Sequence, residues 1–90
     1  MTIRAFALAL LVVVPVLVAS DAQAQSCGDL WYARNSIYKQ AGYCFKTARA
    51  IRTFGNAGCS YDSEYSLPLS SRQRWRIDQI VSAERSMGCR

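Results

Sequence analysis

The chain has 90 residues, which allows one domain at most. Its 11 lysines and arginines oppose 6 acidic residues, so the net charge is +5. The chain contains no histidine, and this excludes catalytic arrangements of the Ser-His-Asp or Cys-His type.

Residues 1–24 show the three-part pattern of a secretory signal peptide. A positive charge at Arg4 precedes a wholly apolar run over residues 5–19. A small-x-small triplet then ends at Ala24 and predicts cleavage there, because the pocket of signal peptidase admits only short side chains. A retained membrane anchor is less favoured, since the apolar run is shorter than the roughly 20 residues that span a bilayer and Pro15 interrupts it.

Four cysteines follow the predicted cleavage site, and export would carry them into an oxidising compartment. No two of them form a C-x-x-C pair, so we expect no metal site. A domain over residues 25–90 buries little apolar surface and is only marginally stable on its core alone. We therefore predict two disulfides among Cys27, Cys44, Cys59 and Cys89, with three possible connectivities.

The first predicted helix begins at a cap on Asp29 and runs to about Ala41. Its apolar residues recur at spacings of three and four, which is one helical face. This face contains Leu30, Ala33, Ile37 and Ala41. Tyr38 lies on the core side of the face, and Trp31 covers its edge. Gly42 is expected to end the helix, because glycine readily takes the left-handed conformation of a C′ residue.

A second, shorter helix is predicted over residues 48–54, with Thr47 as its N-cap and Gly55 as its end. Ile51 and Phe54 are its expected core residues. Three basic residues recur beside them at intervals of three and form a second row, which we call the basic ridge. The basic ridge contains Lys46, Arg49 and Arg52.

Residues 60–68 show neither a helical nor a strand period and predict an ordered loop. Ser70 then caps a third helix, and Gln73 completes a capping box. The helix runs to about Met87, and Gly88 ends it. Its expected buried residues are Ile77, Ile80, Val81 and Met87.

The order of the helices favours one disulfide pairing. Cys27 lies at the start of the first helix and Cys89 follows the third, so antiparallel packing of these helices would bring the two together. A turn after the second helix returns Cys59 toward Cys44. We therefore favour Cys27–Cys89 with Cys44–Cys59, in a mainly α-helical, three-helix, disulfide-stapled domain that follows a cleaved signal peptide.

The acidic residues give little support to catalysis. Asp62 and Glu64 form the one close pair, and paired carboxylates can perform acid–base chemistry in glycoside cleavage. A spacing of two residues within a loop is weak evidence for a catalytic pair. A hydrolase is therefore a minor alternative to a non-enzymatic protein. We expect no cofactor.

Binding is better supported than catalysis. The third helix carries Arg72, Trp75 and Arg76 away from its apolar face, and a tryptophan among arginines has the composition of a contact hot spot. The alternative is that Trp75 covers the loop over residues 61–67 and fills a satellite cluster. The basic ridge is a second candidate surface, although a solvated charged face is the commoner explanation of such a row.

The charge and the compartment together indicate the class of partner. An anionic envelope polymer or lipid head groups would suit both the positive charge and the predicted location outside the cytoplasm. Nucleic acid would suit the positive charge but not that location. The alternative is a secreted inhibitor or effector that binds a protein. A net charge of +5 argues against a basic envelope hydrolase such as lysozyme as its target. After cleavage we expect no membrane-spanning segment.

Several short motifs are spread along most of residues 25–90. They are Leu30-Trp31-Tyr32-Ala33-Arg34-Asn35, Ile37-Tyr38, Gly42-Tyr43-Cys44-Phe45, Lys46-Thr47, the Phe54-Gly55-Asn56 turn with Cys59, and Leu69-Ser70. On these motifs the chain resembles the YARHG domain, a small extracellular module of bacterial secreted proteins. The resemblance implies a periplasmic or secreted bacterial protein. In multidomain relatives the module accompanies peptidases and other cell-surface domains.

The motif that names this family reads Tyr-Ala-Arg-His-Gly, and here Asn35 and Ser36 replace its last two residues. Tyr32, Ala33 and Arg34 match it. Arg34 lies on the first helix beside the apolar face, where a part-buried arginine normally has a designated acceptor. We expect that acceptor to be Asp62 or Glu64 from the loop.

Overall fold

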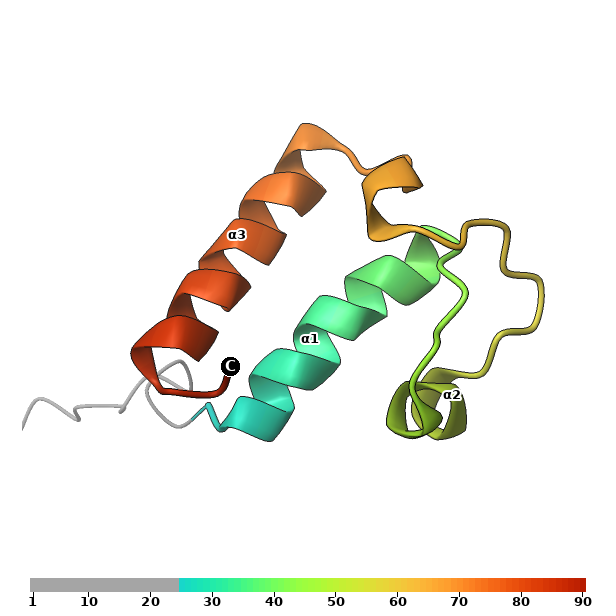
Figure 1. Ribbon diagram of the computed structural model, residues 1–90. Coiled ribbons are helices and arrows are strands. Elements are labelled where there is room, and N and C mark those ends of the chain that lie inside the picture. The colour runs from blue at the N-terminus through green and yellow to red at the C-terminus, as the bar shows by residue number, and fades with distance from the viewer. Residues whose placement is uncertain (1–24) are drawn as a thin grey trace, which may run out of the picture.

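The computed structural model describes residues 25–90, so the predicted signal peptide over residues 1–24 lies outside the described residues. Helix α1 (Cys27–Gln40) is followed by α2 (Ala48–Phe54), a short 3-10 helix η2 (Glu64–Ser66) and α3 (Ser71–Ser86). Helices α1 and α3 lie side by side and run in opposite directions, and α2 packs on the other side of α1 (Figure 1). The predicted mainly α-helical, three-helix domain is confirmed.

The N-cap of helix α1 is Ser26 and not Asp29. The Ser26 hydroxyl accepts a hydrogen bond from the Asp29 amide at 3.1 Å, and the Asp29 carboxylate accepts one from the Ser26 amide at 3.0 Å. The predicted cap at Asp29 was therefore wrong, because this residue closes a capping box from inside the first turn. The hydrogen bonds from the Ser26 backbone and side chain hold the pKa of the Asp29 carboxyl below its usual range.

The caps of the other two α-helices are as predicted. Thr47 caps α2, and Ser70 with Gln73 forms a capping box at the start of α3. Gly55 follows α2 with a φ of 71°, and Gly88 follows the last turn of α3 with the same φ. Each helix is thus bounded by groups within a few residues of its ends.

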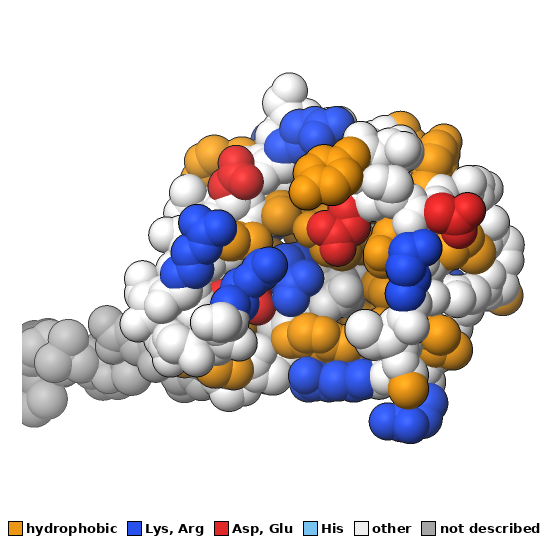
Figure 2. Space-filling model, viewed as in Figure 1, with side chains coloured by type: hydrophobic (Ala, Val, Ile, Leu, Met, Phe, Trp, Pro, Cys, Tyr) orange, Lys and Arg blue, Asp and Glu red, His pale blue; other side chains and the backbone are white. Residues whose placement is uncertain are grey.

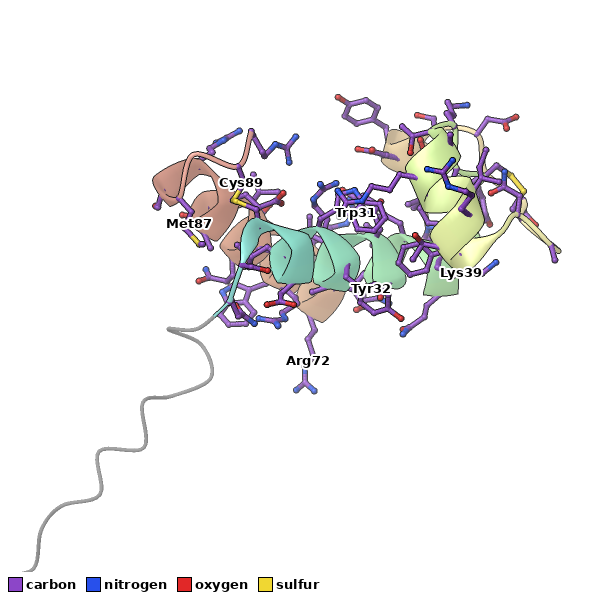
Figure 3. The ribbon with its side chains drawn as sticks, turned by 90° about the horizontal axis from the view of Figure 1, so that it is seen from below. Trp31, Tyr32, Lys39, Arg72, Met87 and Cys89 are labelled. Atoms are coloured by element: carbon purple, nitrogen blue, oxygen red, sulfur yellow. A yellow bond between two sulfur atoms is a disulfide. The ribbon has the colours of Figure 1, made fainter. Side chains whose placement is uncertain are left out.

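The favoured disulfide pairing is confirmed. Cys27 and Cys89 are bonded, with their Cα atoms 5.5 Å apart, and they join the start of α1 to the end of α3. Figure 3 shows Cys89 in this bond beside the first turn of α1. Cys44 and Cys59 are also bonded, with a Cα–Cα distance of 5.1 Å, and they close the loop that contains α2.

The hydrophobic core lies where α1, α2 and α3 meet two connecting segments. Its central cluster consists of Tyr38, Phe45, Ala50, Leu67 and Ile77. Ile80 and Leu30 are also almost fully buried. Phe45 and Leu67 come from segments without regular structure, so no periodic pattern in the sequence marked them as core residues.

Two residues expected in the core are exposed. Ile51 is 42% exposed, because α2 turns Ala50 toward the core instead, and the small side chain lets this helix approach closely. Met87 is 50% exposed, since α3 ends there and the chain turns toward Cys89. The other expected core residues of α3 are Ile77 and Ile80, which are buried, and Val81, which is partly buried.

The link between α1 and α2 pairs with the loop that follows α2. Tyr43 and Tyr61 form an isolated parallel β-bridge. The side-chain amide of Asn56 accepts a hydrogen bond from the Phe45 amide at 2.7 Å and donates one to the Phe45 carbonyl at 2.9 Å. These bonds satisfy both backbone polar groups of a residue that is 4% exposed.

Gly42 is the glycine with the least tolerance for a side chain. It has a φ of 92°, and a Cβ atom there would lie 3.3 Å from Cδ2 of Tyr61. Gly42→Ala is expected to lower the free energy of unfolding by about 1–2 kcal/mol through its positive φ, with an additional loss from the crowded ring. Urea unfolding of the variant measures the total.

Gly58→Ala is the matched control for this prediction. Gly58 also has a positive φ, of 69°, but open space surrounds the position of its Cβ. The control should therefore show the conformational loss alone. Equal losses at the two positions would contradict a steric role of Tyr61.

Candidate functional site

Two open hollows lie on the two flanks of α3. One has a volume of about 410 Å³ and is lined by Ile37, Gln40, Arg72, Gln73, Trp75 and Arg76. We call it the Trp75 hollow. The other has a volume of about 320 Å³ and is lined by Tyr38, Glu64, Tyr65, Leu69, Arg74, Ile77 and Asp78. We call it the Tyr38 hollow.

The Trp75 hollow brings three of the predicted binding residues together. Trp75 is 61% exposed, and Arg72 and Arg76 line the same hollow. Spacings of three and four residues place the side chains on one side of α3. Figure 3 shows Arg72 extending away from the helices toward solvent. The lining contains no carboxylate, so the two guanidinium groups have no competing acidic neighbour within it.

The wall opposite Trp75 comes from α1. Ile37 provides an apolar surface, and Gln40 adds a side-chain amide. Gln73 is held in place, because its side-chain oxygen accepts the capping hydrogen bond from the Ser70 amide at 2.8 Å. The hollow therefore offers an indole ring and an aliphatic side chain together with amide and guanidinium donors.

The basic ridge lies away from the Trp75 hollow. All three of its side chains are exposed, on and just before α2, which packs on the far side of α1 from α3 (Figure 1). The Arg49 guanidinium lies over the Trp31 indole, 3.7 Å from the ring centroid. This cation–π contact gives Arg49 a role in packing as well. On the face seen in Figure 2 the basic side chains are spread out, with acidic side chains between them.

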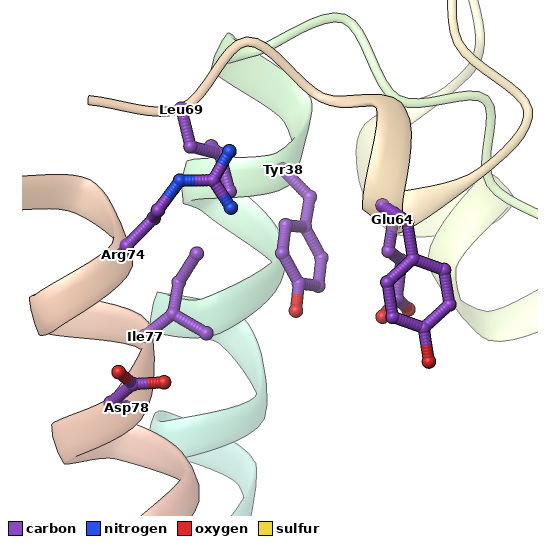
Figure 4. A pocket seen from close by; sticks show the side chains of 7 residues that line it. Tyr38, Glu64, Leu69, Arg74, Ile77 and Asp78 are labelled. Carbon is purple, nitrogen blue, oxygen red and sulfur yellow. The ribbon is translucent and has the colours of Figure 1, made fainter. Parts of the chain in front are cut away.

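The Tyr38 hollow was not foreseen from the sequence. Tyr38 is 7% exposed, and its hydroxyl points into the hollow between Ile77 and Glu64 (Figure 4). Burial and the charge of Glu64 raise the pKa of this phenol, against an opposing effect of Arg34. A phenol hydroxyl is protonated at neutral pH, so this group can both donate and accept hydrogen bonds.

The two candidate catalytic carboxylates, Asp62 and Glu64, do not line the same hollow. Glu64 lines the Tyr38 hollow, and Asp62 does not. The other carboxylate in this hollow belongs to Asp78 on α3. No sequence signal connects Asp78 with Glu64 or Tyr38, because the three come from different elements and meet only in the folded domain.

Arg34 of the name motif binds a buried glutamate. Its Nε atom lies 2.8 Å from Oε1 of Glu84, and a second nitrogen lies 3.3 Å from Oε2. The predicted partners Asp62 and Glu64 were therefore wrong. Burial acts to lower the pKa of Arg34, but the hydrogen bond and the charge of Glu84 raise it overall. The side chains of Arg34 and Glu84 are 14% and 3% exposed, so the pair belongs to the interior.

The residues next to Arg34 also serve packing. Asn35 is 6% exposed and donates a side-chain hydrogen bond to the Trp31 carbonyl at 2.9 Å. The Tyr32 ring packs on Phe54 of α2, with their centroids 5.1 Å apart. The name motif thus connects α1 to both other helices, and its asparagine makes its hydrogen bond within α1.

These features define a small, disulfide-stapled helical module of the kind found outside the cytoplasm. The family model of the YARHG domain matches residues 11–85, and the chain therefore belongs to the YARHG domain family, as its motifs suggested. This domain is a small extracellular module, and the two disulfides fit a secreted protein. No curated protein and no solved structure matches the chain.

Two further properties bear on the classes of site. Within residues 25–90, no helix is long and apolar enough to cross a bilayer. In the same part of the chain, no three acidic or cysteine side chains lie close enough together to hold a metal ion.

Proposed function

We propose that the protein is an exported, non-enzymatic module that binds an anionic polymer of the bacterial cell envelope through the Trp75 hollow. The observation that carries this proposal is the exposed Trp75, which lies between two arginines at a hollow without a carboxylate. Export to the periplasm or beyond is part of the same proposal, supported by the disulfides and by the predicted signal peptide over residues 1–24.

Trp75 leaves a large apolar surface in contact with solvent. A small domain buries little apolar surface, so a large aromatic side chain left 61% exposed forgoes stabilisation that the core could have used. Covering the indole with a ligand would recover part of that free energy. Sites of this kind combine an apolar surface with a few directed polar groups, which is the composition of the Trp75 hollow.

The arginines determine the charge of the expected ligand. A guanidinium group binds carboxylate or phosphate with two parallel hydrogen bonds, and Arg72 and Arg76 present two such groups one helical turn apart. The amides of Gln40 and Gln73 suit the hydroxyl groups of a glycan. The basic ridge and the net charge of +5 would attract the same polymer at longer range.

Retention of the purified domain on peptidoglycan across a salt series tests this proposal. We expect retention at low salt that weakens as salt rises, because exposed charges are screened. Trp75→Ala should weaken retention by about tenfold, the loss expected for a contact worth about 1.4 kcal/mol. Its melting temperature should stay close to that of the parent domain.

Tyr65→Ala is the control for aromatic exposure. Tyr65 is 95% exposed and lies outside the Trp75 hollow, so its replacement should leave retention unchanged. Full retention of the Trp75→Ala variant would contradict the proposal. A large drop in its melting temperature would instead make Trp75 a packing residue.

The second candidate is a secreted inhibitor or effector with a protein partner. The same cluster favours it, because tryptophan and arginine are enriched at the energetic centres of protein interfaces. The two candidates differ in the salt series. Absence of retention on peptidoglycan at low salt would favour the protein partner.

A further inference from the structure

The Tyr38 hollow carries a set of charges different from that of the Trp75 hollow. It contains two carboxylates, from Glu64 and Asp78, and one guanidinium, from Arg74. An anionic polymer would be repelled by the carboxylates, so this hollow does not duplicate the proposed polymer site. Because α3 separates the two hollows, each can be changed without altering the lining of the other.

Arg74 and Asp78 lie four residues apart on α3, a spacing at which opposite charges often pair. They form no ion pair, since the salt bridges among residues 25–90 involve Glu84 alone as the acid. In Figure 4 the Arg74 guanidinium lies beside Leu69, and the Asp78 carboxylate lies on the other side of Ile77. A positive and a negative group thus face one hollow from two ends of an apolar floor.

The Tyr38 hydroxyl adds a group whose position is set by the core. The ring is 7% exposed and packs edge-on against Tyr43, with the centroids 5.8 Å apart. A hydroxyl held in this way loses little conformational freedom when it binds a ligand. It points into the space between α3 and Glu64, where a ligand held by the carboxylates would lie (Figure 4).

We propose that the Tyr38 hollow binds a small zwitterion, namely a free α-amino acid with an aliphatic side chain. The ammonium group would be held by Glu64, and Asp78 would add negative charge from the α3 side of the hollow. The carboxylate would pair with Arg74. The aliphatic side chain would cover Leu69 and Ile77, and a volume of about 320 Å³ accommodates a ligand of this size.

Three ligands test the charge requirement directly. Leucine, leucinamide and N-acetylleucine have the same side chain and differ in charge. Leucine carries both the ammonium and the carboxylate, leucinamide carries the ammonium alone, and N-acetylleucine carries the carboxylate alone. We expect leucine to bind the described domain with a dissociation constant of about a millimolar, as suits a ligand with few atoms. Both capped forms should bind at least about tenfold more weakly, because each leaves one charged group of the hollow without its partner.

Amide chemical shifts from nuclear magnetic resonance report both the affinity and the place of binding. The shifts should change around Tyr38, Glu64 and Asp78 during the leucine titration. Absence of saturable binding, or equal binding of leucine and leucinamide, would overturn the proposal. So would shifts confined to the Trp75 hollow.

Matched variants separate this site from the polymer site. Glu64→Gln and Arg74→Gln should each weaken leucine binding about tenfold, whereas Asp62→Asn and Arg72→Gln should not. All four side chains are exposed, so none of the changes should unfold the domain. Trp75→Ala should leave leucine binding intact. These variants therefore test the zwitterion site independently of the proposed polymer site.

Discussion

Replacement of Glu84 by glutamine is expected to lower the free energy of unfolding by about 3 kcal/mol, because it leaves the charge of Arg34 part-buried without a counter-ion. Glu84 accepts two hydrogen bonds from the guanidinium, and its side chain is 3% exposed. A second arginine, Arg90, lies 3.9 Å away and would lose the same carboxylate. For a domain of this size the loss corresponds to a fall in melting temperature of roughly 12–24 °C.

Glu64→Gln is the control for this substitution, since it makes the same chemical change at an exposed position. It should shift the melting temperature by little. The double variant Arg34→Met Glu84→Met is informative as well, because replacing a buried ion pair by apolar side chains is often less costly than breaking it. A loss below about 1 kcal/mol in Glu84→Gln would show that water reaches Arg34 and replaces the carboxylate.

Removal of the Cys27–Cys89 disulfide should destabilise the domain more than the Glu84 substitution does. The bond joins residues 62 apart, and on a chain-entropy estimate its loss costs about 4 kcal/mol. Small domains have a net stability near the lower end of the range of about 5–15 kcal/mol. We therefore expect the Cys27→Ser Cys89→Ser variant to be largely unfolded at 37 °C, as measured by its helical circular dichroism.

The second disulfide provides the comparison. Cys44–Cys59 closes a loop of 15 residues, and its removal should cost about 3 kcal/mol on the same estimate. The variant without it should therefore unfold at a higher urea concentration than the variant without Cys27–Cys89. If reduction of both bonds left the helical signal and the melting curve unchanged, the disulfides would have no stabilising role.

The two predictions concern one end of the helix pair. Cys89 and Arg90 lie just beyond the C-terminal cap of α3, and the Cys89 amide donates a hydrogen bond to the Glu84 carbonyl at 2.7 Å. The Cys27–Cys89 bond then ties this end to the first turn of α1. Because the bond and the ion pair share this short segment, we expect the losses from removing both to be non-additive.

The local features of the fold could be predicted from the sequence. The caps at Thr47 and Ser70 and the helix ends at Gly42 and Gly88 depend on atoms only a few residues away. The disulfide pairing followed from helix order, because two antiparallel helices bring their far ends together. The cap of α1 was misassigned by one turn, since Ser26 and Asp29 both favour this position.

The candidate sites also differ in whether the sequence could predict them. Arg72, Trp75 and Arg76 could be recognised because one helix places them together. The Tyr38 hollow and the Arg34–Glu84 pair could not be recognised from the sequence, because their members come from elements far apart in the chain. Likewise, only the packing of α2 decided that Ala50 rather than Ile51 faces the core. Local hydrogen bonds and helical spacing are contained in neighbouring residues, whereas the partner of a buried charge depends on which helix faces meet.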